Sequence, residues 1–155
     1  MEFKRVLLPD KDDFYGIYYY EGTDGKRYGE GYRVAGEFQG DFALVKDKHY
    51  NKYFIDRNFK KYGEHYNDIV DFSEGFAVVK MRDGKWYFIR PELNEYGNFD
   101  RYGQGSGGLE KYGEGWEDQP TSFSEGFAIV KEDGGYRFID KEFRYHGWYD
   151  EADGF

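Results

Sequence analysis

The side chains best suited to chemistry in this chain are its 31 Asp and Glu residues. A pair of carboxylates on either side of a sugar bond is the arrangement that most glycosidases use. Glu64 and Glu114, however, each follow the same Tyr-Gly pair at two separate places in the sequence. A catalytic group is normally unique, whereas a group that returns along the chain normally serves the fold. We therefore expect no catalytic carboxylate.

Metal binding is also not expected from the sequence. Asp10, Asp12 and Asp13 form an acidic run, but the glycine and the distal glutamate of a calcium loop are missing. The three histidines are scattered at positions 49, 65 and 146, without the spacing that places two ligands on one face of a helix. The acidic run is best interpreted as a solvated turn.

Nucleophilic and phosphate-binding motifs are absent from the sequence as well. There is no cysteine, and no serine lies in a Gly-x-Ser-x-Gly elbow. The glycine-rich stretch 103–108 contains no lysine and precedes no predicted helix, so it does not resemble a phosphate-binding loop. The sequence predicts a protein that is not an enzyme and needs no cofactor.

The charge of the chain restricts its partners. The formal net charge is −9 and the calculated pI is about 4.9. An acidic protein is repelled by nucleic-acid phosphates and by anionic membrane surfaces, so we expect neither as a direct partner. A basic protein fits better. The residues at the N-terminus lack a signal-peptide core, and no segment has the length and hydrophobicity of a membrane span, which predicts a cytoplasmic protein.

Internal repetition is the strongest pattern in the sequence. Three kinds of segment recur in order: a Phe-Ala run (37–46, 71–80, 122–131), a second apolar run (53–56, 86–90, 136–140) and a Tyr-Gly-Glu segment (27–32, 61–66, 111–116). The spacing indicates a unit of about 33 residues. We predict one domain over 1–155, with units 1–34, 35–68, 69–118 and 119–155 and an insertion within 94–111.

Each unit has the composition of a β-hairpin. The chain holds 17 Tyr and 15 Phe, which suit strands, and 22 Gly, which suit many turns. No segment shows the apolar stripe of a helix. The sequence therefore predicts an all-β array of about four hairpins with little or no helix. The hairpins either stack or close into a ring or barrel, in which case the last half-unit pairs with the first.

The predicted partner-binding residues are aromatic. One core of this size does not readily hold 35 aromatic side chains, so some are expected at the surface, where Tyr and Trp are good contact anchors. The insertion departs from the repeat, and insertions in repeat proteins commonly map to the binding face. We predict a partner-binding set from the insertion and from the two later tryptophans: Tyr96, Phe99, Arg101, Tyr102, Trp116 and Trp148.

The segment 72–89, with its Phe-Ser-Glu-Gly-Phe-Ala run and its later Gly84, Lys85 and Trp86, resembles the WG repeat of bacterial proteins. The resemblance extends over about residues 26–155 and implies an all-β repeat architecture with an interaction role. Tyr87 stands where that family has glycine. The segments 84–88 and 147–149 more weakly resemble choline-binding cell-wall repeats, whose aromatic cages hold quaternary ammonium groups. Their unit is shorter, at about 20 residues, than the unit found here.

These observations predict a non-catalytic protein-binding module of WG-repeat type. A narrower version is an acidic inhibitor or immunity-type protein that blocks a basic partner enzyme. The alternative from a different class is a carbohydrate- or choline-binding cell-wall module.

Overall fold

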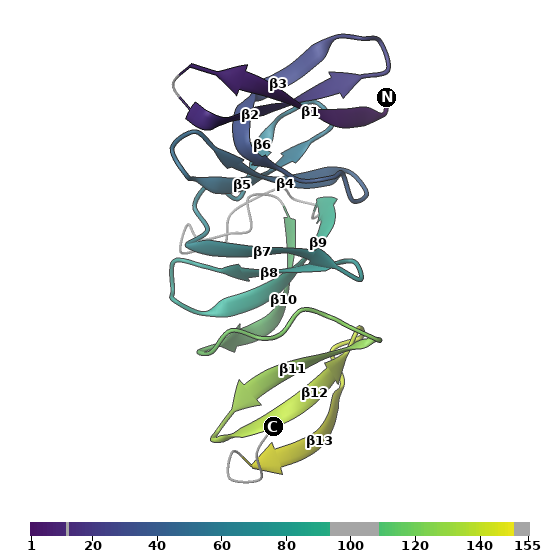
Figure 1. Cartoon of the computed structure of the whole chain (residues 1–155). Helices are drawn as coiled ribbons and strands as arrows, with labels where there is room; N and C mark the ends of the chain where they lie inside the picture. The colour runs from purple at the N-terminus through teal and green to yellow at the C-terminus, as the bar shows by residue number, and fades with distance from the viewer. Residues whose placement is uncertain (12, 94–108, 151–155) are drawn as a thin grey trace. The chain divides into compact units, whose positions relative to one another are not determined.

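The computed structural model describes residues 1–11, 13–93 and 109–150 (Figure 1). Strands make up 63% of these residues, and none of them is helical. The all-β prediction is confirmed. The thirteen strands are β1 (Phe3–Asp10), β2 (Asp13–Gly22), β3 (Arg27–Ala35), β4 (Phe42–Asp47), β5 (Lys52–Asp56), β6 (Lys61–Tyr62), β7 (Asp68–Ser73), β8 (Phe76–Lys80), β9 (Trp86–Leu93), β10 (Leu109–Trp116), β11 (Phe127–Glu132), β12 (Gly135–Asp140) and β13 (Tyr145–Asp150).

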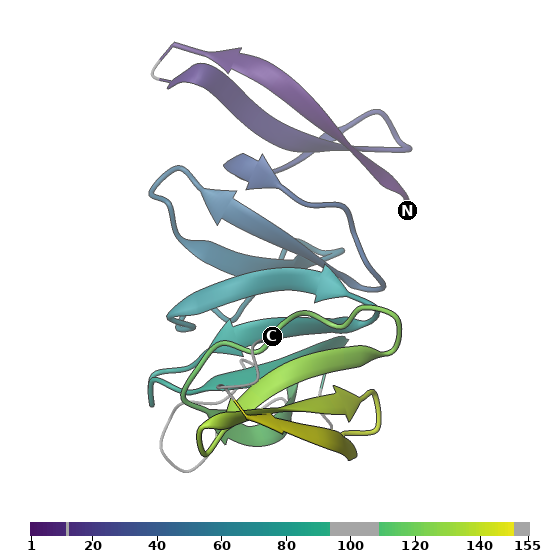
Figure 2. The same ribbon diagram turned by 60° about the horizontal axis from the view of Figure 1, so that its bottom comes forward.

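The strands form three antiparallel sheets in which neighbours in sequence are neighbours in space. The orders are β1 to β6 in the first sheet, β10-β9-β8-β7 in the second and β11-β12-β13 in the third. Figure 2 shows the last sheet with its three strands side by side. Each sheet is open, with an edge strand on both sides. Closure of the array is therefore not found among the described strands, and residues 151–155 of the expected closing segment lie outside them.

The chain divides into two compact units, which we call unit 1 (Met1–Glu64) and unit 2 (His65–Phe155). Unit 1 contains the six-stranded sheet, and unit 2 contains the other two sheets. The boundary lies close to the expected end of the second sequence unit at residue 68. Each unit therefore spans about two of the sequence repeats.

The Ser-Glu-Gly segments form the tight turns that their residues favour. Glu74 and Gly75 both have positive φ, as do Glu125 and Gly126, which is the backbone of a two-residue hairpin turn. Ser124 and Phe127 close the second of these turns with reciprocal backbone hydrogen bonds of 2.9 and 3.1 Å. The hairpins predicted from glycine-containing turns are thus present.

Two of the three Tyr-Gly-Glu segments, 27–32 and 111–116, lie inside the strands β3 and β10, whereas in the third the strand β6 ends at Tyr62. In β10 the pairing with β9 shifts between Tyr112 and Trp116, and the glycines at 113 and 115 both have positive φ. β3 has the same shift and the same pair of positive-φ glycines. The segment is therefore a glycine bulge that turns the last aromatic ring of the strand back over the sheet.

Unit 1 is built around a cluster of six aromatic rings, contributed by Phe3, Tyr20, Tyr28, Tyr32, Phe38 and Phe59. Tyr28 and Phe59 stack with an interplanar angle of 14°, and Phe3 meets Phe59 edge-on at 5.2 Å. Edge-to-face and offset contacts of this kind are the favourable geometries for aromatic pairs. The rings pack in one cluster with Ala35, Ala43, Val45, Tyr53 and Ile55.

Unit 2 repeats this cluster ring for ring, with Phe76, Phe88, Tyr112, Trp116, Phe123 and Phe143. Tyr112 and Phe143 stack with an angle of 10°, and Phe76 meets Phe143 edge-on at 5.4 Å. The correspondence places Phe3 with Phe76, Tyr32 with Trp116, Phe38 with Phe123 and Phe59 with Phe143. The two units are therefore copies of one aromatic framework.

Candidate functional site

Unit 2 contains a cavity of about 440 Å³ that is strongly acidic. One wall is the end of β10 and the residues after it, and the other is the turn between β11 and β12. Five carboxylates and one ammonium group line it, together with Trp116 and two glycines: Glu114, Glu117, Asp118, Lys131, Glu132 and Asp133. We call this feature the acidic cleft.

Glu132 organises the inner part of the acidic cleft. Its Oε1 accepts hydrogen bonds from the Trp116 indole N–H at 2.9 Å and from the Tyr145 hydroxyl at 2.7 Å. Burial and the Glu132 carboxylate together raise the pKa of Tyr145 to about 12, so its hydroxyl stays protonated and keeps donating at neutral pH. Arg137 Nε lies 3.9 Å from the other oxygen of Glu132. The Glu132 carboxylate is thereby fixed in position.

The outer carboxylates of the cleft are weakly paired and open to solvent. Glu117 is 83% exposed and lies 4.0 Å from Lys85, and Asp118 is 61% exposed and lies 3.9 Å from Lys131. Exposed ion pairs at such distances contribute little and are screened by salt. These two side chains can exchange their present partners for cationic groups of another molecule.

An aromatic surface adjoins the cleft through Arg137. The guanidinium carbon of Arg137 lies 4.9 Å from the ring centres of both Tyr145 and Trp148, at cation–π distance. Trp148 lies on the edge strand β13 with 42% of its surface exposed, and Tyr145 is 43% exposed. The same region therefore combines carboxylates with rings that already bind a guanidinium group.

The acidity belongs to unit 2 alone. Residues 1–64 contain twelve Lys and Arg and twelve Asp and Glu, whereas residues 65–155 contain ten and nineteen, so the whole net charge of −9 lies in unit 2. The aromatic framework aligns Glu117 with Arg33 and Asp133 with Lys48. Arg33 donates to the carbonyl oxygen of Lys48 at 3.0 Å and lies 4.2 Å over the ring of Tyr50. The two copies have the same core and different surfaces.

A family model, that of the WG-containing repeat, matches residues 65–86 and 121–136. Two segments of the chain match the WG repeat, as the resemblance predicted. Both matched segments lie in unit 2, and the shared aromatic framework shows that unit 1 has the same organisation. The comparisons with curated proteins and with solved structures found no match. The WG repeat indicates a repeat-containing binding module.

Tyr87, which directly follows the first matched segment and stands where the WG repeat has glycine, has a structural role. Trp86 is buried, and the hydroxyl of the following Tyr87 donates to the Asp83 carboxylate at 2.7 Å. Tyr87 therefore closes the turn that precedes it. In unit 1 Tyr28, the counterpart of Tyr112, makes the same kind of contact with Asp24 in the turn between β2 and β3.

The structure describes two of the six predicted binding residues, Trp116 and Trp148. Trp116 is only 5% exposed and lines the floor of the acidic cleft, so it is mainly a core residue. Trp148 is at the surface and is linked to Trp116 through Arg137 and Glu132. The four residues of the insertion lie outside the described part of the chain: Tyr96, Phe99, Arg101 and Tyr102.

The acidic cleft was not predicted, because its residues are dispersed among many acidic positions. Asp118, Glu132 and Asp133 belong to two segments that only the fold brings together. The unequal charge of the two halves of the sequence could have indicated it.

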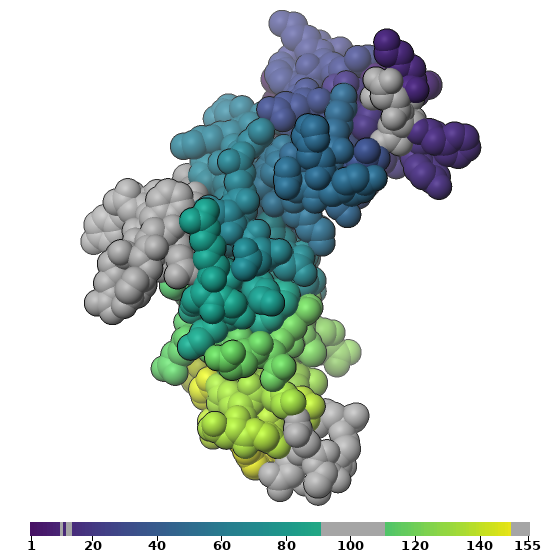
Figure 3. All heavy atoms as spheres, turned by 90° about the vertical axis from the view of Figure 1, so that its left-hand side faces the viewer, coloured from purple at the N-terminus to yellow at the C-terminus, as the bar shows by residue number. Residues whose placement is uncertain are grey.

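A second aromatic surface that was not predicted lies at the tip of the β1–β2 hairpin, where Phe14 and Tyr15 are 96% and 82% exposed. The space-filling view shows this N-terminal hairpin projecting from unit 1 (Figure 3).

The acidic cleft does not have the arrangement of a metal centre. No group of three His, Asp or Glu side chains suited to a metal ion occurs within the described ranges. None of these residues forms a helix long and apolar enough to cross a membrane.

Proposed function

We propose that the chain is a non-catalytic protein-binding module whose acidic cleft receives a basic segment of a partner protein. The observation that carries this proposal is the composition of the cleft, with five carboxylates and one lysine beside two exposed aromatic rings. Complementary charge accelerates association and selects among partners. The net charge of unit 2 adds a field of the same sign. These features support neither nucleic acid nor an anionic membrane as the partner.

The test uses the whole chain as bait in its source lysate, with two variants that change charge equally. Glu117→Lys/Asp118→Lys reverses two exposed carboxylates of the cleft. Asp41→Lys/Glu64→Lys reverses two exposed carboxylates of unit 1 and serves as the control. We expect the wild type and the control to capture the same basic protein in stoichiometric amount, and the cleft variant to lose it.

Salt provides a second readout with the captured protein. An interaction through exposed charges should weaken at least tenfold in Kd when NaCl rises from about 0.05 M to about 0.5 M, because screening shortens the range of the cleft's field. Capture that survives both the high salt and the Glu117→Lys/Asp118→Lys substitution would contradict the proposal. Retention on a choline resin or on cell-wall glycan would instead favour the cell-wall module.

A narrower version is that the module is a cytoplasmic inhibitor of a basic enzyme. Its support is the small size of the chain, its net charge of −9 and the concentration of that charge on one unit. An acidic surface can occupy the substrate groove of an enzyme that acts on polyanions. The captured protein should then lose its activity on adding one equivalent of wild-type chain and keep it on adding the cleft variant.

A further inference from the structure

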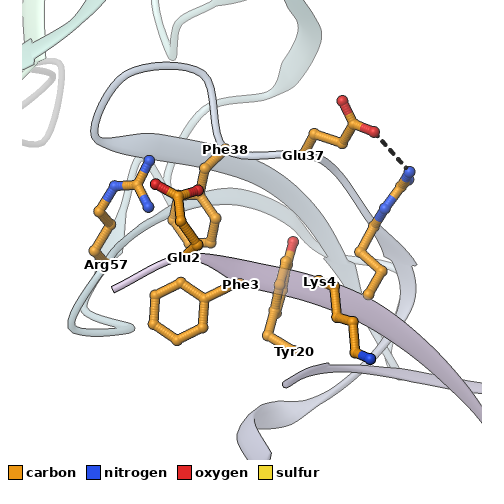
Figure 4. Close-up of a pocket in the computed structure, with 8 residues that line it drawn as sticks. Glu2, Phe3, Lys4, Tyr20, Glu37, Phe38 and Arg57 are labelled. Carbon is orange, nitrogen blue, oxygen red and sulfur yellow. Dashed lines mark hydrogen bonds and ion pairs between the residues drawn. The ribbon is translucent and has the colours of Figure 1, made fainter. Parts of the chain in front are cut away.

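Unit 1 contains a second cavity of about 440 Å³, and its chemistry differs from that of the acidic cleft. Phe3, Tyr20 and Phe38 of the aromatic cluster line it, and Arg57 and Glu37 lie toward opposite ends of the view in Figure 4. Three cationic side chains and two carboxylates complete the lining: Lys4, Arg5, Arg57, Glu2 and Glu37. The cavity therefore has an aromatic floor and a charged rim.

Two of the three cations are already paired with carboxylates. Arg5 donates to the carbonyl oxygen of Ala35 and to Glu37, both at 3.1 Å. Lys4 Nζ lies 3.6 Å from the carboxylate of Glu21. These pairs fix one side of the rim, and their charges are largely offset.

Arg57 is held in a different way. Its guanidinium donates to the carbonyl oxygens of Met1 and Gly40, at 3.2 and 3.0 Å, and lies 4.9 Å over the ring of Phe38. Carbonyl oxygens and a ring fix its orientation without supplying a negative charge. Glu2 lies near Arg57 in Figure 4 but does not come within ion-pair distance, and no other described carboxylate does. The charge of Arg57 is thus oriented and not offset by an ion pair.

The copy of this position in unit 2 shows what such a cation binds. Lys141 precedes Phe143 by two residues, as Arg57 precedes Phe59, and its Nζ lies 3.1 Å from Oε1 of Glu74. The same oxygen accepts a hydrogen bond from the Gly126 N–H at 2.9 Å. These two donors hold the pKa of Glu74 below its ordinary value. In unit 2 the cation at this position therefore binds a carboxylate of the chain itself.

Unit 1 lacks the carboxylate that fills this site. Glu74 lies two residues before Phe76, and the residue two before Phe3 is Met1. We propose that the cavity of unit 1 binds the carboxylate of a ligand, which occupies on Arg57 the place that Glu74 occupies on Lys141. This proposal concerns unit 1 only and is independent of the acidic cleft.

The rest of the cavity defines the class of ligand. Phe3 and Phe38 offer apolar rings beside Arg57, so the carboxylate should carry an aromatic or branched aliphatic group. Glu2 on the rim repels a second negative charge, which favours a monoanion over phosphate. An apolar carboxylic acid and the C-terminal residue of a peptide share this chemistry.

The test is an NMR titration of the ¹⁵N-labelled whole chain with four probes. They are N-acetyl-Ala-Phe with a free C-terminus, its C-terminal amide, phenylacetate and inorganic phosphate. We expect the two carboxylates to shift amide signals of residues in unit 1, and the amide and phosphate to bind at least tenfold more weakly. Tighter binding of the peptide than of phenylacetate would identify a peptide C-terminus as the ligand, and equal binding a small acid.

Variants locate the site. Arg57→Gln should weaken binding of the peptide acid at least tenfold, and Arg57→Lys should recover part of it, because a lysine restores the charge and not the two-pronged donor. Lys60→Gln removes an exposed charge three residues away and should have no effect. A dispersed spectrum for each variant verifies folding. Equal shifts by acid and amide, or full binding by Arg57→Gln, would overturn the proposal.

Discussion

At the scale of single residues, aspartate carboxylates hold the turns of this protein. Asp140 is the most heavily used. Its Oδ1 accepts from the backbone N–H groups of Glu142 and Arg144, at 2.9 and 3.0 Å, and its Oδ2 lies 2.8 Å from His146 Nε2 and 3.0 Å from Arg144 Nε. Asp56 organises the corresponding turn of unit 1, where Tyr62 takes the place of His146. The side chain of Asp140 is 13% exposed.

The contacts of Asp140 predict a dependence of stability on pH. The imidazole of His146, the backbone N–H groups and Arg144 hold the pKa of Asp140 well below its ordinary value. A carboxyl with a lowered pKa in the folded state stabilises the fold fully above its unfolded pKa, near 4, and loses this effect as pH falls further. Asp140→Asn should lower the free energy of unfolding at pH 7 and flatten its fall between pH 5 and pH 2.

Urea denaturation followed by circular dichroism at several pH values measures this effect. Glu142→Gln is the matched control, since Glu142 pairs with Arg144 at the surface and exposed pairs contribute at most about 1 kcal/mol. If Asp140→Asn leaves the slope between pH 5 and pH 2 unchanged, the hydrogen bonds of Asp140 are not formed in solution.

At the scale of elements, the glycine bulge of β10 shows why a repeated segment needs its glycines. A Cβ atom built on Gly113 would lie 2.5 Å from the ring of Trp116, and φ at this position is +98°. Gly126 also has positive φ, +86°, but a Cβ there meets nothing within 4 Å. The two positions share the backbone penalty and differ in the steric one.

Replacing these glycines separates the two penalties. Gly126→Ala should cost about 1–2 kcal/mol of unfolding free energy, the usual cost of a left-handed alanine. Gly113→Ala should lower the free energy of unfolding by a further ~1–3 kcal/mol, because the Trp116 ring must move out of the core. Thermal or urea unfolding of the two variants gives the comparison. An equal loss for both would mean that Trp116 does not fold back over the bulge.

The elements were the part of the structure that the sequence predicted best. Alternating aromatic runs and Asp-Gly turns have local causes, so the hairpins at β8–β9 and β11–β12 follow from pattern alone. The bulge at Tyr112–Trp116 could not be predicted from the pattern, because two closely spaced glycines are equally typical of a turn. The role of Phe3 as the partner of Phe76 was also missed, since residues before 26 lack the recurring motif and only ring packing reveals the match.

At the scale of the whole molecule, one aromatic framework occurs twice with two different surfaces. Unit 1 is neutral and has a cavity with an arginine that forms no ion pair with a described carboxylate, whereas unit 2 holds the entire net charge and the acidic cleft. The sequence predicted an acidic binding protein with Trp148 among its partner-binding residues. The sequence could not predict the cleft, because Asp118 follows β10 of one sheet and Glu132 ends β11 of another, and only the fold of unit 2 brings them together. A duplicated core with two different surfaces suits a module that binds two different chemical groups, one on each unit.

The divergence also predicts unequal stability at equivalent positions. Phe123 is fully buried among the rings of unit 2, so Phe123→Ala should cost about 3–5 kcal/mol, the usual loss for a sealed aromatic site. Phe38, its counterpart, lines the open cavity of unit 1 and is only partly buried, so Phe38→Ala should cost less.

Urea denaturation of the two variants ranks these losses, and hydrogen exchange assigns each loss to its unit. We expect Phe123→Ala to expose amides of residues 65–150 and Phe38→Ala those of residues 1–64. Because cavities destabilise in proportion to the volume that cannot collapse, the order depends on whether the space beside Phe38 is already open. A larger loss for Phe38→Ala than for Phe123→Ala would show that the rings of unit 1 close over this space in solution, and that no preformed cavity awaits a ligand beside Arg57.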